Sequence, residues 1–178
     1  MGRDKLIAPF AGVPLARRVV LALLDLAPLV VAPPAVAAVL ADLHGFRIIP
    51  TPRTDGPSVT LALADAQVPA DLALAVVACD LPFLDAARVR AFLARVPANA
   101  DIAYPAVGGM PGHPVVWSPK ARTRIAALSP EAAPMSVRSD RALRVLALDA
   151  GDDAYVTDVD TPETWRAAER RAAGGEGH

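Results

Sequence analysis

Short apolar or β-branched runs alternate with alanine-rich amphipathic stretches from one end of the chain to the other. Apolar runs bounded by turn residues predict strands, and amphipathic stretches predict helices. Prolines 14, 57, 119 and 162 suit first helical positions. The pattern predicts strands over residues 29–31, 47–49, 72–79, 102–104, 115–117, 145–148 and 155–159, and helices over 14–27, 35–43, 57–67, 85–95, 119–128 and 162–172. Such alternation is typical of an α/β protein whose mostly parallel sheet carries helices on both faces.

The clearest strand is LALAVVAC, residues 72–79, which lies between Asp71 and Asp80. Eight apolar residues without alternation predict a central strand buried on both faces. Ligands of open parallel sheets bind beyond the carboxyl ends of strands, so Asp80 is a candidate for the functional site. An aspartate in a turn or at a helix cap fits this position about equally well.

Length and composition favour one folded domain. The chain has 178 residues, of which 53% are hydrophobic and 21% charged, enough for one sizeable core. We expect a single domain over residues 1–173 and a frayed tail over residues 174–178.

Several function classes are excluded by the same numbers. The longest apolar runs reach about eight residues, against about twenty for a membrane span. A net charge of -1 and 4% aromatic residues argue against binding to nucleic acid. A single cysteine, Cys79, excludes a disulfide framework. With no signal peptide at Met1, we expect a cytoplasmic protein.

The segment DVDTPETW near the C-terminus carries two further candidates, Asp158 and Asp160. On an extended backbone, residues two apart point to the same face. Two carboxylates from different strand ends are a normal way to hold Mg²⁺. Thr161 is expected to cap a helix that begins at Pro162, and Asp160 fits the start of that helix equally well.

Cationic candidates lie in MGRDK, where Arg3 and Lys5 offer donors suited to phosphate oxygens. The charges of Arg3 and Lys5 fit a solvated chain terminus equally well. Gly56 and Pro57, followed by Ser58, form a tight entry into a helix whose free amides can hold an anion or a base edge.

The segment GGMPGHPVVW places His113 in a glycine-rich loop. Glycines such as Gly112 let the backbone approach a ligand closely, and His113 could donate to a phosphate or a pterin. A structural histidine bound to backbone carbonyls is the alternative.

Taken in order, these motifs resemble the molybdenum-cofactor nucleotidyltransferases, guanylyl and cytidylyl transferases with a Rossmann-like three-layer α/β/α domain. MGRDK matches the end of that family's LAGGxSxRMGxxK signature, and AGVPL, DGPSVTLALADA and CDLPFL resemble the segments that follow. GMPGHPVVWSPKA resembles the cytidylyltransferase branch. DVDTPETW resembles the D-x-D-T-P-E-D ending, with Thr164 in place of the usual acid.

The resemblance implies transfer of GMP or CMP from GTP or CTP to molybdopterin, with Mg²⁺ as cofactor and pyrophosphate as product. It also implies a molybdoenzyme or a cofactor-carrier protein as a partner. The implied site residues are Lys5 and Asp80 for catalysis; Arg3, Lys5, Gly56, Pro57, Ser58 and Asp80 for the nucleotide; Gly112 and His113 for the acceptor; and Asp80, Asp158 and Asp160 for the metal.

Several alternatives stay open. The segment with Gly56 and Pro57 favours the guanylyl branch of the family, whereas the P-G-H-P loop favours the cytidylyl branch. A 2-phospholactate guanylyltransferase-like enzyme, or an inactive relative that binds the cofactor, also fits the aspartate pattern. Because Met1 falls on the internal methionine of the family signature, we expect the strand and glycine loop before it to be missing and neighbouring strand edges to be unpaired.

Overall fold

The structure is a computed structural model that describes residues 3–51 and 56–175. No helix in these two ranges has the length and apolar character needed to cross a membrane. The strands are β1 (Pro9–Phe10), β2 (Val13–Pro14), β3 (Leu29–Ala32), β4 (Arg47–Pro50), β5 (Leu74–Val76), β6 (Ile102–Val107), β7 (Met110–Pro111), β8 (Val115–Trp117) and β9 (Val145–Asp149). The α-helices are α1 (Leu15–Leu23), α2 (Pro34–Val39), α3 (Pro57–Asp65), α4 (Ala86–Leu93), α5 (Pro119–Arg122) and α6 (Pro162–Gly175). Short 3₁₀ turns are η1 (Arg3–Leu6), η2 (Leu24–Leu26), η3 (Ile125–Ala127), η4 (Pro134–Ser139) and η5 (Asp153–Tyr155).

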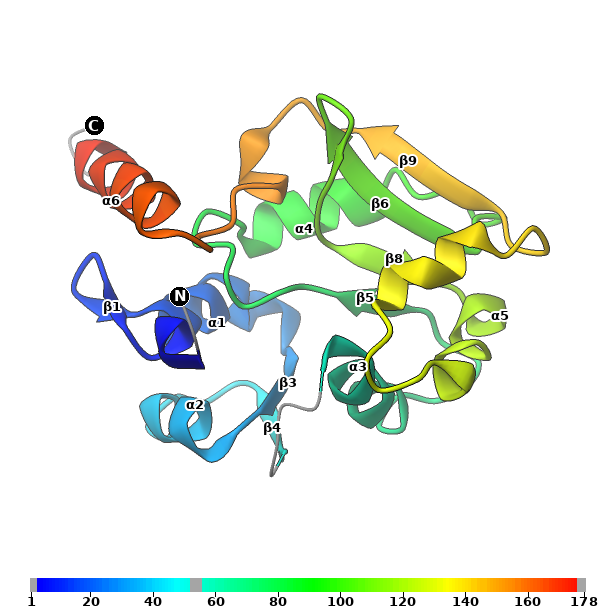
Figure 1. Cartoon of the computed structure of the whole chain (residues 1–178), viewed down its shortest axis with the longest axis horizontal. Coiled ribbons are helices and arrows are strands. Elements are labelled where there is room, and N and C mark those ends of the chain that lie inside the picture. The colour runs from blue at the N-terminus through cyan, green and yellow to red at the C-terminus, as the bar shows by residue number, and fades with distance from the viewer. Residues whose placement is uncertain (1–2, 52–55, 176–178) are drawn as a thin grey trace.

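The main sheet has the order β5-β8-β6-β7, with β9 paired to β6 (Figure 1). Only β6 and β9 run parallel, whereas β5–β8, β6–β8 and β6–β7 are antiparallel. The prediction of a mostly parallel sheet is therefore wrong. The reversal occurs at Gly108 and Gly109, whose φ angles of 57° and 84° lie in the left-handed region and allow the tight turn between β6 and β7.

A second, two-stranded sheet contains the parallel pair β3–β4. Within the described ranges, no strand connects β3 to β5, so the strands do not form one continuous sheet. β5 is shorter than the predicted strand over 72–79, and Ala75 at its centre is exposed. The prediction of burial on both faces is wrong, because the face that carries Ala75 is exposed, whereas Leu74 and Val76 on the other face pack against the core.

Residues 155–159 do not form the predicted strand. The chain makes the η5 turn instead, because the Asp152 side chain accepts a hydrogen bond from the Ala154 N–H at 2.9 Å. Asp158 and Asp160 therefore do not lie on one face of a strand.

Helices cover both faces of the main sheet, as predicted. Side chains alternate along β6: Ile102 packs with α3 and α5, whereas Ala103 packs with α1, α4 and α6. β8 repeats the alternation, with Trp117 on the first face and Val116 on the second. A third cluster joins α1 and α2 to β3.

Proline positions account for most helix starts. Proline begins α3, α5 and α6, whereas Pro14 stands just before α1. At α6, Thr161 Oγ1 accepts from the Thr164 N–H at 3.2 Å and Thr164 Oγ1 accepts from the Thr161 N–H at 3.0 Å. This reciprocal pair is a capping box in which Thr164 does the work of the usual acid.

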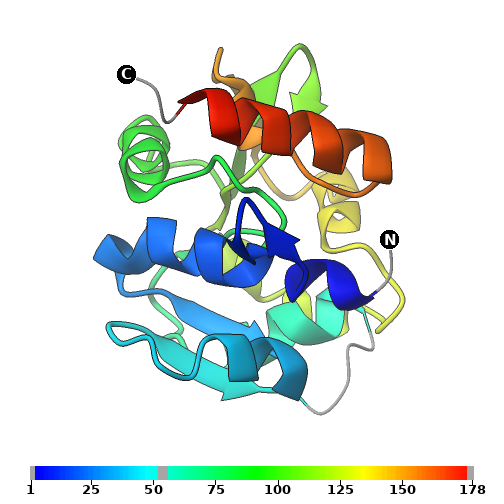
Figure 2. The same ribbon diagram turned by 90° about the vertical axis from the view of Figure 1, so that its left-hand side faces the viewer.

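Helix α6 lies over the N-terminal hairpin, as Figure 2 shows in red above blue. Trp165 packs edge-on against Phe10, with ring centroids 5.4 Å apart. The contact brings the first and last elements of the chain together.

Arg122 is the most deeply buried charge described, with 6% of the residue exposed. Its Nε donates to Asp65 Oδ1 at 2.5 Å, and its terminal nitrogens donate to the carbonyls of Asp65, Val68, Pro69 and Leu72 at 2.6–3.1 Å. Arg122 therefore binds the last carbonyl of α3 and three carbonyls of the segment that leads into β5, and fixes that segment.

We expect Arg122→Met to lower the free energy of unfolding by about 3 kcal/mol, because it leaves Asp65 and four carbonyls without their buried donor. The control is Arg124→Gln, which removes the partly exposed pair with Asp140 and should cost less than about 1 kcal/mol. Urea denaturation measures both values. Equal losses would contradict the anchoring role of Arg122.

Candidate functional site

Three segments far apart in sequence meet at the side chain of Lys5. Its Nζ donates to Asp80 Oδ2 at 2.8 Å and also to Asp160 Oδ1. Lys5 lies on η1, Asp80 in the turn between β5 and α4, and Asp160 just before α6. The structure thus brings Asp80 and Asp160 to one place.

Lys5 is held as a charged group. Burial would lower the pKa of its ammonium, but the hydrogen bonds to Asp160 and Asp80, and the charges of both, raise this pKa above the ordinary lysine value. The exposed fraction of its side chain is 17%, against 22% for Asp80 and 56% for Asp160. The ammonium is therefore more shielded from water than either carboxylate.

Asp158 belongs to the same acidic cluster. Partial shielding from water raises its pKa, and the negative charges of Asp160 and Asp80 raise it further, while Lys5 acts in the opposite direction. The Lys5 ammonium therefore bonds two carboxylates directly, and its charge also acts on Asp158.

The donor set suits a divalent cation, because Mg²⁺ and Mn²⁺ prefer carboxylate oxygens. Across the residues that the structure describes, no three His, Cys, Asp or Glu side chains form a ready-made metal site. Asp80 and Asp160 instead converge on the ammonium of Lys5. A metal-binding role for these carboxylates stays a prediction.

Asp80 is positioned by the turn after β5. The strand ends at Val76, so Asp80 does not end a strand as predicted but lies four residues beyond it. Leu81 and Leu84 are buried in the core below α1 and fix this turn. Burial, with the charge of Asp80, raises the pKa of the Cys79 thiol to about 11, so Cys79 is not a thiolate nucleophile at neutral pH.

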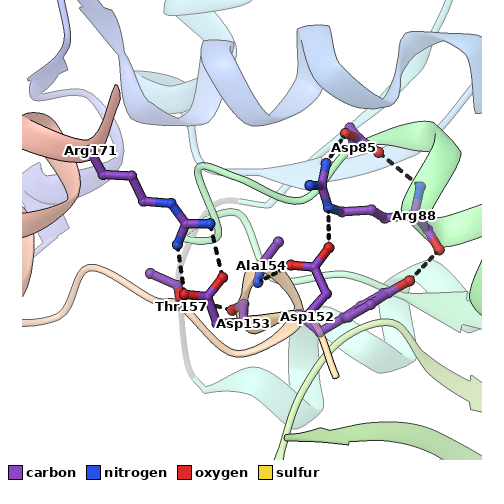
Figure 3. A network of polar contacts seen from close by, with 8 residues as sticks. Asp85, Arg88, Asp152, Asp153, Ala154, Thr157 and Arg171 are labelled. Atoms are coloured by element: carbon purple, nitrogen blue, oxygen red, sulfur yellow. Dashed lines mark hydrogen bonds and ion pairs between the residues drawn. The ribbon is translucent and has the colours of Figure 1, made fainter. Parts of the chain in front are cut away.

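Ion pairs position the segment that carries Asp158 and Asp160 (Figure 3). Arg88 Nε on α4 donates to Asp152 Oδ2 at 2.8 Å, and Arg171 on α6 makes two 2.9 Å hydrogen bonds to Asp153. Sequence reasoning missed these residues. No local motif could have revealed them, since the paired charges lie 64 and 18 positions apart.

Gly112 and His113 pack directly on η5. The His113 N–H donates to the Tyr155 carbonyl at 2.9 Å, and a Cβ on Gly112 would collide with that same oxygen. His113 Nδ1 lies 3.0 Å from the carbonyl of Val76 at the end of β5. Because a carbonyl only accepts, Nδ1 carries the proton, and Nε2 is the nitrogen that can meet a ligand.

Gly56, Pro57 and Ser58 form the start of α3, as predicted, with Gly56 at a φ of 122°. Ser58 is buried, and its hydroxyl donates to the Ala132 carbonyl at 2.6 Å. The hydroxyl of Ser58 therefore holds α3 to the 130–132 loop, and a nucleotide-binding role for these three residues stays a prediction.

The backbone of Arg3 belongs to η1, but its side chain lies outside the described part of the structure. Its predicted role in binding the nucleotide is therefore not tested.

The family model of the MobA-like NTP transferase domain matches residues 1–162. The chain belongs to this family. The family implies a nucleoside triphosphate as substrate, and the sequence resemblance to molybdenum-cofactor nucleotidyltransferases is confirmed.

Solved structures share this α/β nucleotidyltransferase fold. A nucleotidyl transferase from Methanothermobacter is 16% identical, with 96% of this chain and 86% of that chain covered and a TM-score of 0.78. The molybdopterin-guanine dinucleotide biosynthesis protein A of Archaeoglobus fulgidus is 15% identical, covering 97% and 92%, with a TM-score of 0.77. A Mycobacterium tuberculosis protein in complex with manganese is 22% identical, covering 95% and 93%, with a TM-score of 0.72. No curated protein matches the sequence significantly.

The raised pKa of Asp158 predicts a pH-dependent stability. The folded state binds a proton at Asp158 more tightly than the unfolded state does. The contribution of this proton to the stability of the fold is therefore fully present below the unfolded pKa and is lost as pH rises through the folded pKa. With divalent metal chelated, we expect Asp158→Asn to melt about 1–2 °C above the unsubstituted protein near pH 7, with a smaller difference near pH 4.5.

Differential scanning calorimetry measures these melting temperatures. The control is Asp71→Asn, an exposed aspartate outside the acidic cluster, which should leave the melting temperature unchanged. A lower melting temperature for Asp158→Asn near pH 7 would contradict the repulsion inferred among the three carboxylates.

Proposed function

We propose that this protein is a Mg²⁺-dependent nucleotidyltransferase that transfers GMP or CMP from GTP or CTP to the terminal phosphate of molybdopterin. The observation that carries the proposal is the convergence of Lys5, Asp80 and Asp160, with Asp158 nearby, in a chain of the MobA-like family. One structural neighbour is named for molybdopterin-guanine dinucleotide biosynthesis and another holds manganese, which supports this acceptor and a divalent metal.

In the proposed reaction, an oxygen of the molybdopterin phosphate forms a bond to the α-phosphorus of the triphosphate. The bond between the α-phosphorus and the bridging oxygen breaks, and pyrophosphate leaves with the electron pair. The nucleophile is already anionic, so no strong general base is needed. The barrier comes mainly from charge crowding and alignment.

The acidic cluster and Lys5 meet this need for charge and alignment. Asp80, with Asp160 or Asp158, would hold the metal ion, which when bound neutralises and aligns phosphate oxygens. Lys5 would donate to the oxygens of the triphosphate, and Arg3 is a second cation on the same turn.

Two further segments would bind the two substrates. Gly56, Pro57 and Ser58 at the start of α3 would lie near the base. Gly112 and His113 would lie toward the pterin, with His113 Nε2 forming a hydrogen bond to the acceptor.

We expect Asp80→Asn to lower pyrophosphate release at least about 100-fold, because it removes a charge from the metal site. The fold should persist, as judged by circular dichroism, because an asparagine keeps an oxygen that can accept from Lys5 and the Lys5–Asp160 pair remains. The control is Glu163→Gln, which neutralises an exposed acid three residues after Asp160 and should keep full turnover. Full turnover of Asp80→Asn with Mg²⁺ would contradict the proposal.

The same assay separates the alternatives. Pyrophosphate release with 2-phospholactate and GTP, but not with molybdopterin, would replace the proposed acceptor. Binding of molybdopterin without release, for either GTP or CTP, would identify an inactive cofactor-binding relative.

His113→Ala should raise the KM for molybdopterin about tenfold while changing the KM for the nucleotide less than about twofold, since it removes one hydrogen bond to the acceptor. His44→Ala alters an exposed histidine and is the control. Steady-state kinetics with each substrate varied gives both constants. Equal effects on both would assign His113 the structural role suggested by its bond to Val76.

A further inference from the structure

We infer that Lys5 holds the place of the divalent cation in the free protein, so that metal and triphosphate enter the site together. The inference rests on the proposed function, in which Asp80 and Asp160 are metal ligands. It concerns what occupies these carboxylates before any ligand arrives, and hence the order in which ligands can bind.

Lys5 and a metal ion would compete for the same two oxygen atoms. The Lys5 ammonium contacts Asp80 Oδ2, at 2.8 Å, and Asp160 Oδ1. Mg²⁺ binds carboxylate oxygens at about 2.0–2.1 Å, so an ion bound to both oxygens would overlap the nitrogen. Occupation of these two oxygen atoms by Lys5 and by a metal ion is therefore mutually exclusive.

Displacing Lys5 by the metal alone is unfavourable. Two charge-assisted hydrogen bonds would break, and the ammonium would be left beside a dication without a new acceptor. A triphosphate changes this balance because its oxygens can accept from the ammonium. Lysine suits such an exchange, since it is a compact charge on a flexible four-carbon stem.

Exchange of this kind couples the two ligands. The metal binds only to the fraction of molecules in which Lys5 has left the carboxylates, so its apparent affinity is reduced by that fraction. Triphosphate increases the fraction and therefore the metal affinity. By reciprocity, the metal must tighten triphosphate binding by the same factor.

The test measures Mn²⁺ binding to the full chain by electron paramagnetic resonance, without nucleotide. We expect Lys5→Met and Lys5→Gln to bind Mn²⁺ at least about tenfold more tightly than the unsubstituted protein, and Lys5→Arg to bind it weakly. Circular dichroism checks that each variant is folded.

The matched control is Arg18→Met, which also removes one positive charge near the Asp80 turn. Arg18 Nε lies 3.3 Å from the Pro82 carbonyl, and its guanidinium lies 5.5 Å from the Phe10 ring centroid. Because this side chain does not bridge the two carboxylates, Arg18→Met should change Mn²⁺ affinity less than about threefold.

Calorimetry with inorganic triphosphate measures the coupling. In the unsubstituted protein, Mn²⁺ should tighten triphosphate binding at least about tenfold, and in Lys5→Met this factor should fall below about threefold. Equal coupling in the two proteins would overturn the exchange.

The remaining outcomes separate this inference from the proposed function. If the unsubstituted protein binds Mn²⁺ alone as tightly as Lys5→Met does, and Asp80→Asn abolishes binding, the exchange is wrong while the metal site stands. Equal tightening by Arg18→Met and Lys5→Met would show a general charge effect and also overturn the exchange. If no variant binds Mn²⁺, with or without triphosphate, both proposals fail.

Discussion

The central constraint on this structure is the bridge that the Lys5 ammonium makes between Asp80 and Asp160. Asp158 lies close enough for the negative charges of Asp160 and Asp80 to raise its pKa, so the three carboxylates repel one another and the positive charge of Lys5 offsets part of that repulsion. The bridge also ties the first turn of the chain to the turn after β5 and to the start of α6, so the site depends on contacts between distant segments.

Core packing and ion pairs elsewhere in the fold hold the turn after β5 and the start of α6 in place. The buried leucines after Asp80 fix one carboxylate to the core. Arg88 and Arg171 fix η5, and with it the path of the chain to Asp158 and Asp160. Because the glycine loop of His113 hydrogen-bonds to η5, the loop proposed to bind the acceptor and the acidic cluster are mechanically joined.

The sequence predicts local structure well and pairing poorly, for a physical reason. Proline at first helical positions and the apolar run of β8 are local signals. This strand and the helix starts at Pro57, Pro119 and Pro162 lie where expected, whereas α5 ends at Arg122 and not at residue 128. The direction of β7 and β8 depends on a tight turn at Gly108 and Gly109, which hydrophobic periodicity does not encode. The run at 72–79 is apolar enough for a central strand, but apolarity does not specify which neighbours pair with its edges.

In the candidate site too, the sequence indicates the residues but not the contacts between distant segments. Asp80, Asp160 and Lys5 could be selected as candidates because the segments around them resemble family motifs, and their roles stay predictions. Their direct contact could not be predicted, since it depends on how α6 and η1 pack around Phe10 and Trp165. The ion pairs of Arg88 and Arg171 have no sequence signature, because each partner is an ordinary surface charge until the fold brings it near.

An internal cation also changes what a metal does for such a protein. In a structural metal site, carboxylates or thiolates without their ion repel, and the free energy of metal binding becomes free energy of folding. Here Lys5 supplies a neutralising charge from within the chain at Asp80 and Asp160. On the proposed function, binding then exchanges one cation for another at these carboxylates, and the ammonium released by that exchange lies next to the anionic group that must be stabilised.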